Sequence, residues 1–142
     1  METGSNRGLL LIVSGPAGSG KTTVCARMAE KFAPDVERVV TSTTRSPREG
    51  ERHGVDYFFF TDEEFDELLR EDQFYEHAKV HTYRYGTLKR AILHKLASDI
   101  DLILSIDVQG AATVRKSTCG DPSLASRVST VFIVPENLDQ LR

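Results

Sequence analysis

The sequence predicts an α/β fold, in which a doubly wound parallel sheet carries a small inserted α+β domain. A glycine-rich turn at residues 15–22 lies between an apolar run and a helix-like segment, and further apolar runs alternate with segments of helical periodicity. Roughly sixty residues separate the second apolar run from the third, which is too long for a plain crossover connection. We therefore expect a core, residues 1–43 and 98–142, and an insert, residues 44–97.

The core elements are predicted by apolar runs and by the signals that end helices. Pro34 closes the first helix, because proline has no N–H to donate. In chain order we expect a strand at 9–14, a helix at 21–32, strands at 38–42 and 101–107, a helix at 109–116, a turn at 121–123, a buried strand at 128–134 and a last helix opened by Glu136. Ligands of such sheets bind at the carboxyl ends of the strands, where Gly15 and Asp107 are expected.

The insert has elements of its own. Residues 55–60 are aromatic and β-prone, and residues 73–80 form another expected strand. Thr61 and Glu64 have the spacing of a capping box, which predicts that a helix begins after Thr61. A second helix is expected over residues 87–97, because apolar side chains recur there with helical spacing.

Residues 15–22 match the motif G-x-x-x-x-G-K-[ST] between a strand and a helix. In this setting the backbone N–H groups cradle an anion beside the helix N-terminus, whereas a bare strand–helix turn would bind nothing. Lys21 can reach the β- and γ-phosphates of a nucleotide, and the Thr22 hydroxyl can ligate Mg²⁺. The expected phosphate-binding residues are Gly15, Pro16, Ala17, Gly18, Ser19, Gly20, Lys21, Thr22 and Thr23. The motif therefore predicts a site for a nucleoside triphosphate.

Composition excludes several classes of function. The net charge of −3 provides no basic field for nucleic acid or an anionic membrane, and the apolar runs are too short to span a bilayer. Residues 1–7 lack the apolar region of a secretory signal. Cys25 and Cys119 lie too far apart in sequence for a disulfide framework or a zinc set, so we expect a cytoplasmic protein. His77 and His81 lack further ligands, which favours a structural role over metal binding.

The densest polar cluster of the chain, residues 41–57, opens the insert. Arg45 and Arg48 could clamp a phosphate from two directions. Composition alone favours a solvated charge run, in which Glu49 and Glu51 partly cancel the positive field. Spacing within the longer string decides between these two interpretations.

That string resembles the signature of guanylate kinases. It reads Ser42-Thr43-Thr44-Arg45-x-Pro47-Arg48-x-Gly50-Glu51-x-x-Gly54-x-Asp56-Tyr57, and it is followed in order by Phe74-x-Glu76, Tyr85-Gly86-Thr87 and Ile106-Asp107-Val108-Gln109-Gly110. The resemblance runs from about Leu9 to the last residue. It implies a P-loop NTPase-type fold, with ATP in the loop at Gly15 and GMP under the insert.

The family pattern also implies roles for single residues. The GMP phosphate would be held by Arg45, Arg48, Tyr57 and Tyr85. The guanine base would be read or supported by Glu76, Thr87, Asp107 and a hydroxyl of Thr41 or Ser42, with Gly86 as a further GMP-binding position. Lys21, Arg45 and Arg48 would be catalytic, Thr22 would hold Mg²⁺, and Asp107 would contact the ion through water. The implied partners are ATP and GMP, without nucleic acid or membrane.

Physical chemistry supports the role of Glu76 independently. Guanine presents two adjacent donors, its N1–H and its exocyclic amine, and an ionised carboxylate is a matching fork of acceptors. Adenine has no ring N–H on that edge, so it would leave the carboxylate poorly paired. Without its neighbours, Glu76 would be interpreted as a surface carboxylate on an edge strand.

The sequence departs from the family pattern in two places. Ser105 stands where the family commonly carries an acid, which removes a charge from one face of a strand and predicts weaker organisation of Mg²⁺. Family members also continue through an arginine-bearing lid, a further strand and a terminal helix, whereas this sequence ends at Arg142. The resemblance therefore implies a C-terminally truncated member. Its family activity is expected of the parent protein, while the turnover of this chain alone is doubtful.

The expected reaction is in-line transfer of the γ-phosphoryl group of MgATP to GMP, with positioning and charge neutralisation as the means of catalysis. The alternatives are a guanylate-kinase-like protein-interaction module without catalysis, or a kinase for another nucleoside monophosphate. The intact phosphate loop favours an enzyme over an interaction module. A GTPase switch is disfavoured, because the sequence has no Asn-Lys-x-Asp loop late in the chain.

Overall fold

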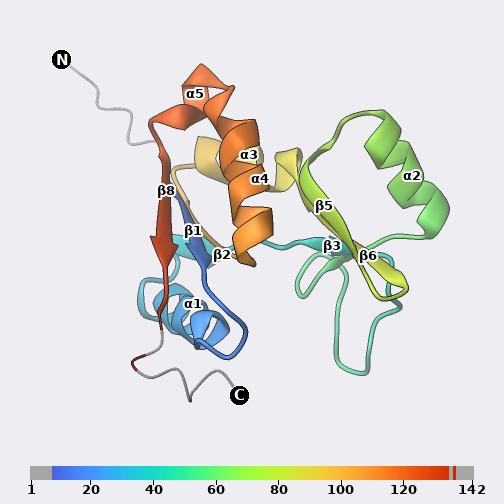
Figure 1. Ribbon diagram of the computed structural model, residues 1–142, viewed down its shortest axis with the longest axis horizontal. Coiled ribbons are helices and arrows are strands. Elements are labelled where there is room, and N and C mark those ends of the chain that lie inside the picture. The colour runs from blue at the N-terminus through green and yellow to red at the C-terminus, as the bar shows by residue number, and fades with distance from the viewer. Residues whose placement is uncertain (1–7, 135, 137–142) are drawn as a thin grey trace. The chain divides into compact units, whose positions relative to one another are not determined.

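A computed structural model describes residues 8–134 and residue 136, and these divide into two compact units (Figure 1). The core unit consists of the described residues up to Val39 and from Ile92 onward, and the inserted unit runs from Val40 to Ala91. The insert expected from the sequence, residues 44–97, begins and ends a few residues later than this unit. None of the helices in the described part of the chain has the length and apolarity needed to cross a bilayer.

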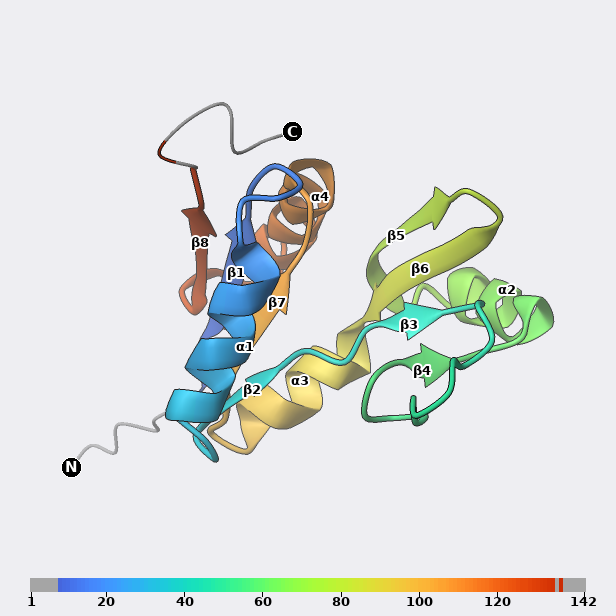
Figure 2. The ribbon, with the colours of Figure 1, turned by 90° about the horizontal axis from the view of Figure 1, so that it is seen from below.

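The core unit contains a parallel sheet with the strand order β2-β7-β1-β8. The strands are β1 (Leu10–Ser14), β2 (Val36–Arg38), β7 (Asp101–Ser105) and β8 (Val128–Phe132). The helices are α1 (Lys21–Lys31), α4 (Val108–Cys119), α5 (Pro122–Ala125) and the greater part of α3 (Lys89–Ala97). Figure 2 shows α1 in front of β1 and β7 and α4 behind them. The predicted α/β class with a parallel sheet is therefore confirmed.

Burial explains why the two central strands read as unbroken apolar runs. Leu10, Ile12 and Val13 of β1 are at most 2% exposed, and Leu102, Ile103 and Leu104 of β7 are 1% exposed. Both strands have neighbouring strands on each side and helices on both faces. Side chains on either face are therefore buried, and apolar residues do not alternate with polar ones. Cys25 of α1 packs into the same core against Val13 and Ile103, as expected of a small buried thiol.

Three predicted core elements were wrong in detail. The strand expected at 38–42 is two strands, β2 in the core sheet and β3 (Ser42–Thr43) in the sheet of the insert. β8 was expected to be buried, but it is the edge strand, and its Phe132 is 53% exposed. The turn at 121–123 opens the short helix α5, whose first turn Asp121 caps by accepting a hydrogen bond from the Ser123 N–H. The helix expected at Glu136 lies outside the described residues.

The inserted unit contains a second sheet, with the strand order β4-β3-β6-β5, and one helix packed on it. Its elements are β3, β4 (Phe58–Phe59), α2 (Asp62–Arg70), β5 (Phe74–Val80) and β6 (Tyr83–Leu88). β6 was not predicted, and its last residues were assigned to the helix that instead begins at Lys89. β3 runs parallel to β4 and antiparallel to β6.

The register of this sheet separates an apolar face from a polar face. Ser42 pairs with Phe58 and Gly86, whereas Thr43 pairs with Phe59 and Tyr85. Because neighbouring residues of a strand point to opposite faces, these two rows lie on opposite sides of the sheet. The row of Phe58 continues into the buried cluster of Phe65, Phe74 and Leu88, with Phe60, Leu68 and Leu69 packed against it. The row of Tyr85 forms the other face, which holds the candidate site.

A β-bulge in β5 moves one carboxylate onto the polar face. Phe74 pairs with Leu88, but Glu76 pairs with Thr87, so two steps along β5 match one step along β6 and Tyr75 is the extra residue. In a regular strand residues 74 and 76 would share a face. With the bulge, Phe74 packs in the apolar core while Glu76 lies beside Thr87 on the polar face.

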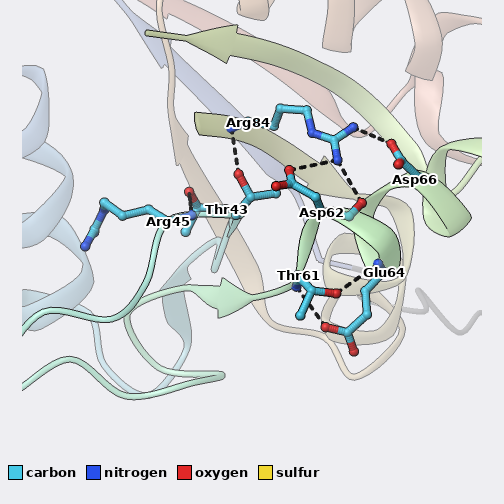
Figure 3. Close-up of polar contacts among 8 residues, drawn as sticks. Thr43, Arg45, Thr61, Asp62, Glu64, Asp66 and Arg84 are labelled. Carbon is cyan, nitrogen blue, oxygen red and sulfur yellow. Dashed lines mark hydrogen bonds and ion pairs between the residues drawn. The ribbon is translucent and has the colours of Figure 1, made fainter. Parts of the chain in front are cut away.

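The capping box that begins α2 is confirmed (Figure 3). The Thr61 hydroxyl accepts a hydrogen bond from the Glu64 N–H at 3.1 Å, and the Glu64 carboxylate accepts one from the Thr61 N–H at 2.8 Å. Arg84 of β6 then fastens the helix to the sheet, because its guanidinium donates to Asp62 and Asp66 and lies 4.6 Å from the centre of the Phe65 ring.

Replacing Thr61 with alanine is expected to lower the free energy of unfolding by about 1 kcal/mol, since the Glu64 N–H in the first turn loses its capping partner. Urea unfolding followed by circular dichroism measures this loss. Thr82→Ala in the exposed β5–β6 turn is the control and should have little effect. Equal effects of the two substitutions would contradict the role of the cap.

Candidate functional site

The glycine-rich loop connects β1 directly to α1, as the motif predicts. Gly15 has no room for a side chain, because a Cβ there would lie 2.6 Å from the Ile133 carbonyl oxygen. Gly20 takes the left-handed conformation, with φ of 88°, and is the N-cap residue of α1. That helix has neither a side-chain cap nor an acidic residue in its first turn. Its first N–H groups and the positive end of its dipole therefore lack a negative partner from the helix itself, as suits an anion site.

Lys21 is the first residue of α1 and bends back over the loop. Its Nζ donates a hydrogen bond to the Gly15 carbonyl oxygen at 3.0 Å. Thr22 and Thr23 follow on the first turn, with exposed side chains. The Ser19 hydroxyl is buried and has no hydrogen-bond partner among the residues that the structure describes. All nine residues expected to bind the triphosphate therefore belong to this loop and the first turn of α1.

The carboxyl end of β7 brings Ser105 next to α1. Ser105 pairs with Val13 of β1, and its side chain lies near enough to the Cys25 thiol to act on that group's pKa. Burial raises the pKa of Cys25, and the contact with Ser105 and the charges of Arg38 and Lys21 oppose that rise only in part. This thiol is therefore a poor nucleophile at neutral pH, because little of it is thiolate.

Asp107 has a structural role that the sequence analysis missed. It is the N-cap of α4, and its Oδ1 accepts a hydrogen bond from the Gly110 N–H at 2.6 Å. The exposed Asp107 belongs to the core unit, whereas the other residues expected to bind GMP belong to the inserted unit. A capping carboxylate keeps further lone pairs, so the cap and a contact to a ligand are compatible.

Ser105→Asp tests whether the missing acid matters. The new carboxylate would lie at the end of β7 and is expected to lower the Mg²⁺ concentration needed for half-maximal ATP binding, because it adds a charged oxygen ligand. Titration calorimetry of ATP at several Mg²⁺ concentrations measures this. An unchanged Mg²⁺ dependence would contradict the prediction. Ser105→Asn is the control, because it adds similar bulk without charge.

In the inserted unit Arg45 is the most constrained of the predicted side chains. It is 8% exposed, and its guanidinium forms a bidentate ion pair with Glu51, with Nη1 to Oε1 at 2.9 Å and Nη2 to Oε2 at 3.1 Å. Nη1 also donates to the Ser46 carbonyl oxygen. The hydrogen bonds to Glu51 raise the pKa of Arg45 further above its usual range. Figure 3 shows the side chains of Arg45 and Arg84 extending in opposite directions.

Aromatic side chains surround this guanidinium. Its carbon lies 5.3 Å from the centre of the Tyr57 ring and 6.0 Å from that of Phe59. The Tyr57 and Tyr85 rings contact each other edge to face, at 6.3 Å between centres, and both hydroxyls lie near enough to Arg45 to raise the pKa of its guanidinium. The structure thus brings together Arg45, Tyr57 and Tyr85. An arginine held among hydroxyl groups is a suitable partner for a phosphate.

Glu51 also holds the loop that carries Arg48. Its Oε1 accepts a hydrogen bond from the Arg48 N–H at 2.7 Å, while the Arg48 side chain is exposed. Hydrogen bonds from Arg45 and then from the Arg48 N–H lower the pKa of Glu51 from 4.5 to about 2. From composition, Glu51 was expected only to weaken the positive field of the arginines by its charge. The sequence did carry a signal for this ion pair. Glu51 follows Arg45 by six residues with Pro47 between them, and a turn at the proline can bring the two side chains together.

The ion pair predicts a pH dependence of stability. Since folding lowers the pKa of Glu51, the pair stabilises the fold fully above about pH 4.5, and this contribution is lost as the pH falls toward 2. Glu51→Gln should therefore unfold at a lower temperature than the unsubstituted chain at pH 7. The difference should shrink between pH 4.5 and pH 2. Thermal unfolding across this range measures it, and a difference that stays constant down to pH 2.5 would contradict the prediction.

Glu76 and Thr87 form a second polar pair on the same face of the sheet. They are register partners, and the Thr87 hydroxyl donates to Glu76 Oε2 at 3.0 Å. Thr87 is fully buried and Glu76 is half-buried. Since Tyr85 and Thr87 alternate with Gly86 along β6, the Tyr85 hydroxyl and the Glu76 carboxylate belong to one face of the sheet. Polar groups for a phosphate and for a base therefore share this surface.

The strand register shows on which face of the inserted sheet three further residues lie that were expected to bind GMP. The Ser42 hydroxyl is buried, has no hydrogen-bond partner among the described residues, and lies in the row that packs toward α2. Thr41 precedes it and belongs to the row of Thr43, on the polar face. Gly86 packs against the Phe74 ring, which would lie 2.7 Å from a Cβ at this position.

Within the described residues, His77 and His81 belong to no cluster of side chains that could hold a metal ion. His77 lies in β5, and His81 lies in the following turn with φ of 59°. In the described part of the chain no group of three His, Cys, Asp or Glu side chains could hold a metal ion.

Comparisons with known proteins agree with the resemblance seen in the sequence. A family model described as guanylate kinase matches residues 7–142. The guanylate kinase of Clostridium perfringens strain SM101 is 42% identical over 139 residues, which are 97% of this chain and 60% of that protein. The guanylate kinase of the Wolbachia of Brugia malayi is 42% identical over 137 residues, which are 96% of this chain and 67% of that protein.

A solved structure gives the same result. The crystal structure of guanylate kinase from Anaplasma phagocytophilum matches with a TM-score of 0.68 and 28% identity, over 97% of this chain and 65% of that one. The chain thus spans about three fifths to two thirds of the length of these relatives.

Proposed function

The chain belongs to the guanylate kinase family, and from this we propose that it forms the nucleotide-binding part of an ATP:GMP phosphotransferase. The reaction transfers the γ-phosphoryl group of ATP to the phosphate of GMP and yields ADP and GDP. The observation that chiefly supports GMP as acceptor is the shared polar face of the inserted sheet. There Arg45, Tyr57 and Tyr85 offer donors to a phosphate, while Glu76 offers acceptors to a base.

The core unit would bind ATP. The N–H groups of residues 15–20 and of the first turn of α1 surround the phosphates, and Lys21 exchanges its bond to the Gly15 carbonyl for the β- and γ-phosphates. The Thr22 hydroxyl and, through water, the Asp107 carboxylate would offer oxygen ligands of the kind that Mg²⁺ prefers. When bound, this ion neutralises charge on the phosphate oxygens.

The inserted unit would bind GMP. Arg45 and Arg48 screen the charge of the acceptor phosphate, and the hydroxyls of Tyr57 and Tyr85 orient it. Glu76 accepts the guanine N1–H and the exocyclic amine, and Thr87 holds the carboxylate in place. The Thr41 hydroxyl, on the polar face, is favoured over that of Ser42 as the further base contact. Catalysis then consists of positioning and charge neutralisation, without a covalent intermediate.

We also infer a cytoplasmic protein, because Cys25 and Cys119 are both free thiols. Neither ATP nor GMP binding requires a membrane or a nucleic acid.

A coupled assay with ATP and GMP tests the proposal. The chain is assayed beside a longer form that carries the remaining C-terminal part found in the relatives. We expect ADP and GDP formation by the longer form with GMP, and much slower turnover with AMP, dTMP or UMP. Equal rates with another nucleoside monophosphate would contradict the proposal that GMP is the specific substrate.

Titration with ATP separates an enzyme from a protein-interaction module of the same fold. The intact loop at Gly15 predicts saturable, Mg²⁺-dependent binding of ATP to the chain. An interaction module would bind no ATP under these conditions. Absence of binding would therefore favour that alternative.

A further inference from the structure

Among the described residues, Glu51 is the side chain that hydrogen-bonds to both arginines of the proposed phosphate site, to the guanidinium of Arg45 and to the backbone N–H of Arg48. Its two carboxylate oxygens bind Nη1 and Nη2 of Arg45 at 2.9 and 3.1 Å, and Oε1 also accepts the Arg48 N–H at 2.7 Å. The pair is shielded from water, since the side chains of Arg45 and Glu51 are 9% and 22% exposed. A bidentate pair of this kind fixes both the position and the plane of the guanidinium.

The rest of the Arg45 environment leaves a defined part of the guanidinium for a ligand. Glu51 occupies the edge formed by Nη1 and Nη2, and the Ser46 carbonyl takes the other N–H of Nη1. Three of the five N–H groups are therefore used. The Nε–H and one N–H of Nη2 are not used by Glu51 or Ser46, and the hydroxyl oxygens of Tyr57 and Tyr85 interact with the same guanidinium as acceptors, because it carries only donors. A phosphate oxygen could replace these acceptors at the two N–H groups and accept hydrogen bonds from both hydroxyls as well.

We propose that Glu51 is a positioning residue for the GMP phosphate, which it serves by fixing the Arg45 guanidinium and the backbone at Arg48. This inference rests on the proposed function, because it takes GMP as the ligand of the polar face. Glu51 itself does not touch the phosphate. It sets the direction in which the two arginines present their remaining N–H groups.

The charge of Glu51 and its positioning role would act on GMP binding in opposite directions. The direction in which a Glu51 substitution changes the affinity for GMP therefore distinguishes the two roles. If Glu51 acted only as a counter-charge, its removal would leave Arg45 more positive and GMP would bind more tightly. If Glu51 positions the arginines, its removal frees the guanidinium to rotate and weakens binding. Misplacement of a binding group by about 1 Å can cost on the order of 100-fold.

Calorimetric titration of GMP and of guanosine into the chain separates these outcomes. Glu51→Gln is expected to weaken GMP binding roughly 10- to 100-fold, with little change for guanosine, because only the phosphate contacts depend on the arginines. Glu49→Gln is the matched control, since it removes the same charge from an exposed position two residues away, and it should leave GMP binding unchanged. Unchanged or tighter GMP binding by Glu51→Gln, or an equal loss for guanosine, would overturn the inference.

A second measurement does not depend on GMP. In ¹⁵N spectra of the ligand-free chain, the bidentate pair should restrict rotation of the Arg45 guanidinium and give separate Nη signals, which Glu51→Gln should merge into one. Merged signals in the unsubstituted chain would overturn the inference. If the unsubstituted chain fails to bind GMP at all, the proposed function fails and the inference with it. If it binds GMP and Glu51→Gln binds equally well, only the inference fails.

Discussion

Replacing Lys21 with alanine is expected to slow phosphoryl transfer by roughly 10³-fold or more, with little change in the unfolding temperature. Among the residues that the structure describes, the ammonium group makes one hydrogen bond, to the Gly15 carbonyl oxygen at 3.0 Å, and Lys21 is not part of the buried core. Its proposed role is to place positive charge on the phosphoryl group in transit. The fold therefore loses little with the side chain, while the transition state loses a charge partner.

The coupled ATP/GMP assay on the longer form measures this rate, with thermal unfolding of both variants measured in parallel. Lys31→Ala is the control, because Lys31 lies in the last turn of the same helix, where its Nζ is 5.6 Å from the centre of the Phe32 ring. It should keep full activity. Normal turnover by Lys21→Ala would show that the loop does not act as proposed.

The second large effect is expected on base selection. Glu76→Gln should reduce the preference for GMP over AMP, measured as the ratio of kcat/KM, by about 10²- to 10⁴-fold. A glutamine presents one acceptor and one donor group where guanine needs two acceptors, so one of its donors would face an N–H. Thr87 would keep its position on β6, but its hydroxyl would lose a charged acceptor.

Rates with GMP and AMP for the longer form measure this preference. Glu67→Gln on the exposed side of α2 is the matched control and should leave the ratio unchanged. If Glu76→Gln lowered both rates equally, Glu76 would have a general structural role and base selection would have to lie elsewhere.

Local signals in the sequence were sufficient for several elements of the fold. The capping box at Thr61, the loop before Lys21 and the apolar strand that ends at Ser105 were all found, because each depends on residues close together in the chain. β6 was missed because Arg84 and Gly86 interrupt its β-prone residues, and because its pairing with β3 depends on residues some forty positions earlier. The exposure of β8 was missed because its residues are apolar although its position is an edge.

The candidate site shows the same limit. The residue types and their order indicated a phosphate and a base, but whether Thr41 or Ser42 faces the site depends on strand register, which the sequence alone left open. The role of Glu51 was missed because it depends on how close the carboxylate lies to the Arg45 guanidinium in the folded chain, whereas composition shows only its charge. Asp107 was assigned to ligands, while its hydrogen bond to Gly110 also begins a helix.

The extra residue at Tyr75 fixes which side chains of β5 face the candidate site. If β5 kept all its residues but paired with β6 without the bulge, Tyr75 would lie opposite Thr87 and Glu76 opposite Gly86, so the Glu76 carboxylate would turn toward Phe65 and Leu88. Loss of Tyr75 itself would leave Glu76 paired with Thr87 in a regular ladder. Changes of length at His81 and Thr82, beyond the last paired residues of the hairpin, would leave this phase intact. In descendants of this gene, insertions and deletions should therefore be tolerated at the hairpin tip, whereas between Phe74 and Glu76 only changes that keep Glu76 opposite Thr87 should persist.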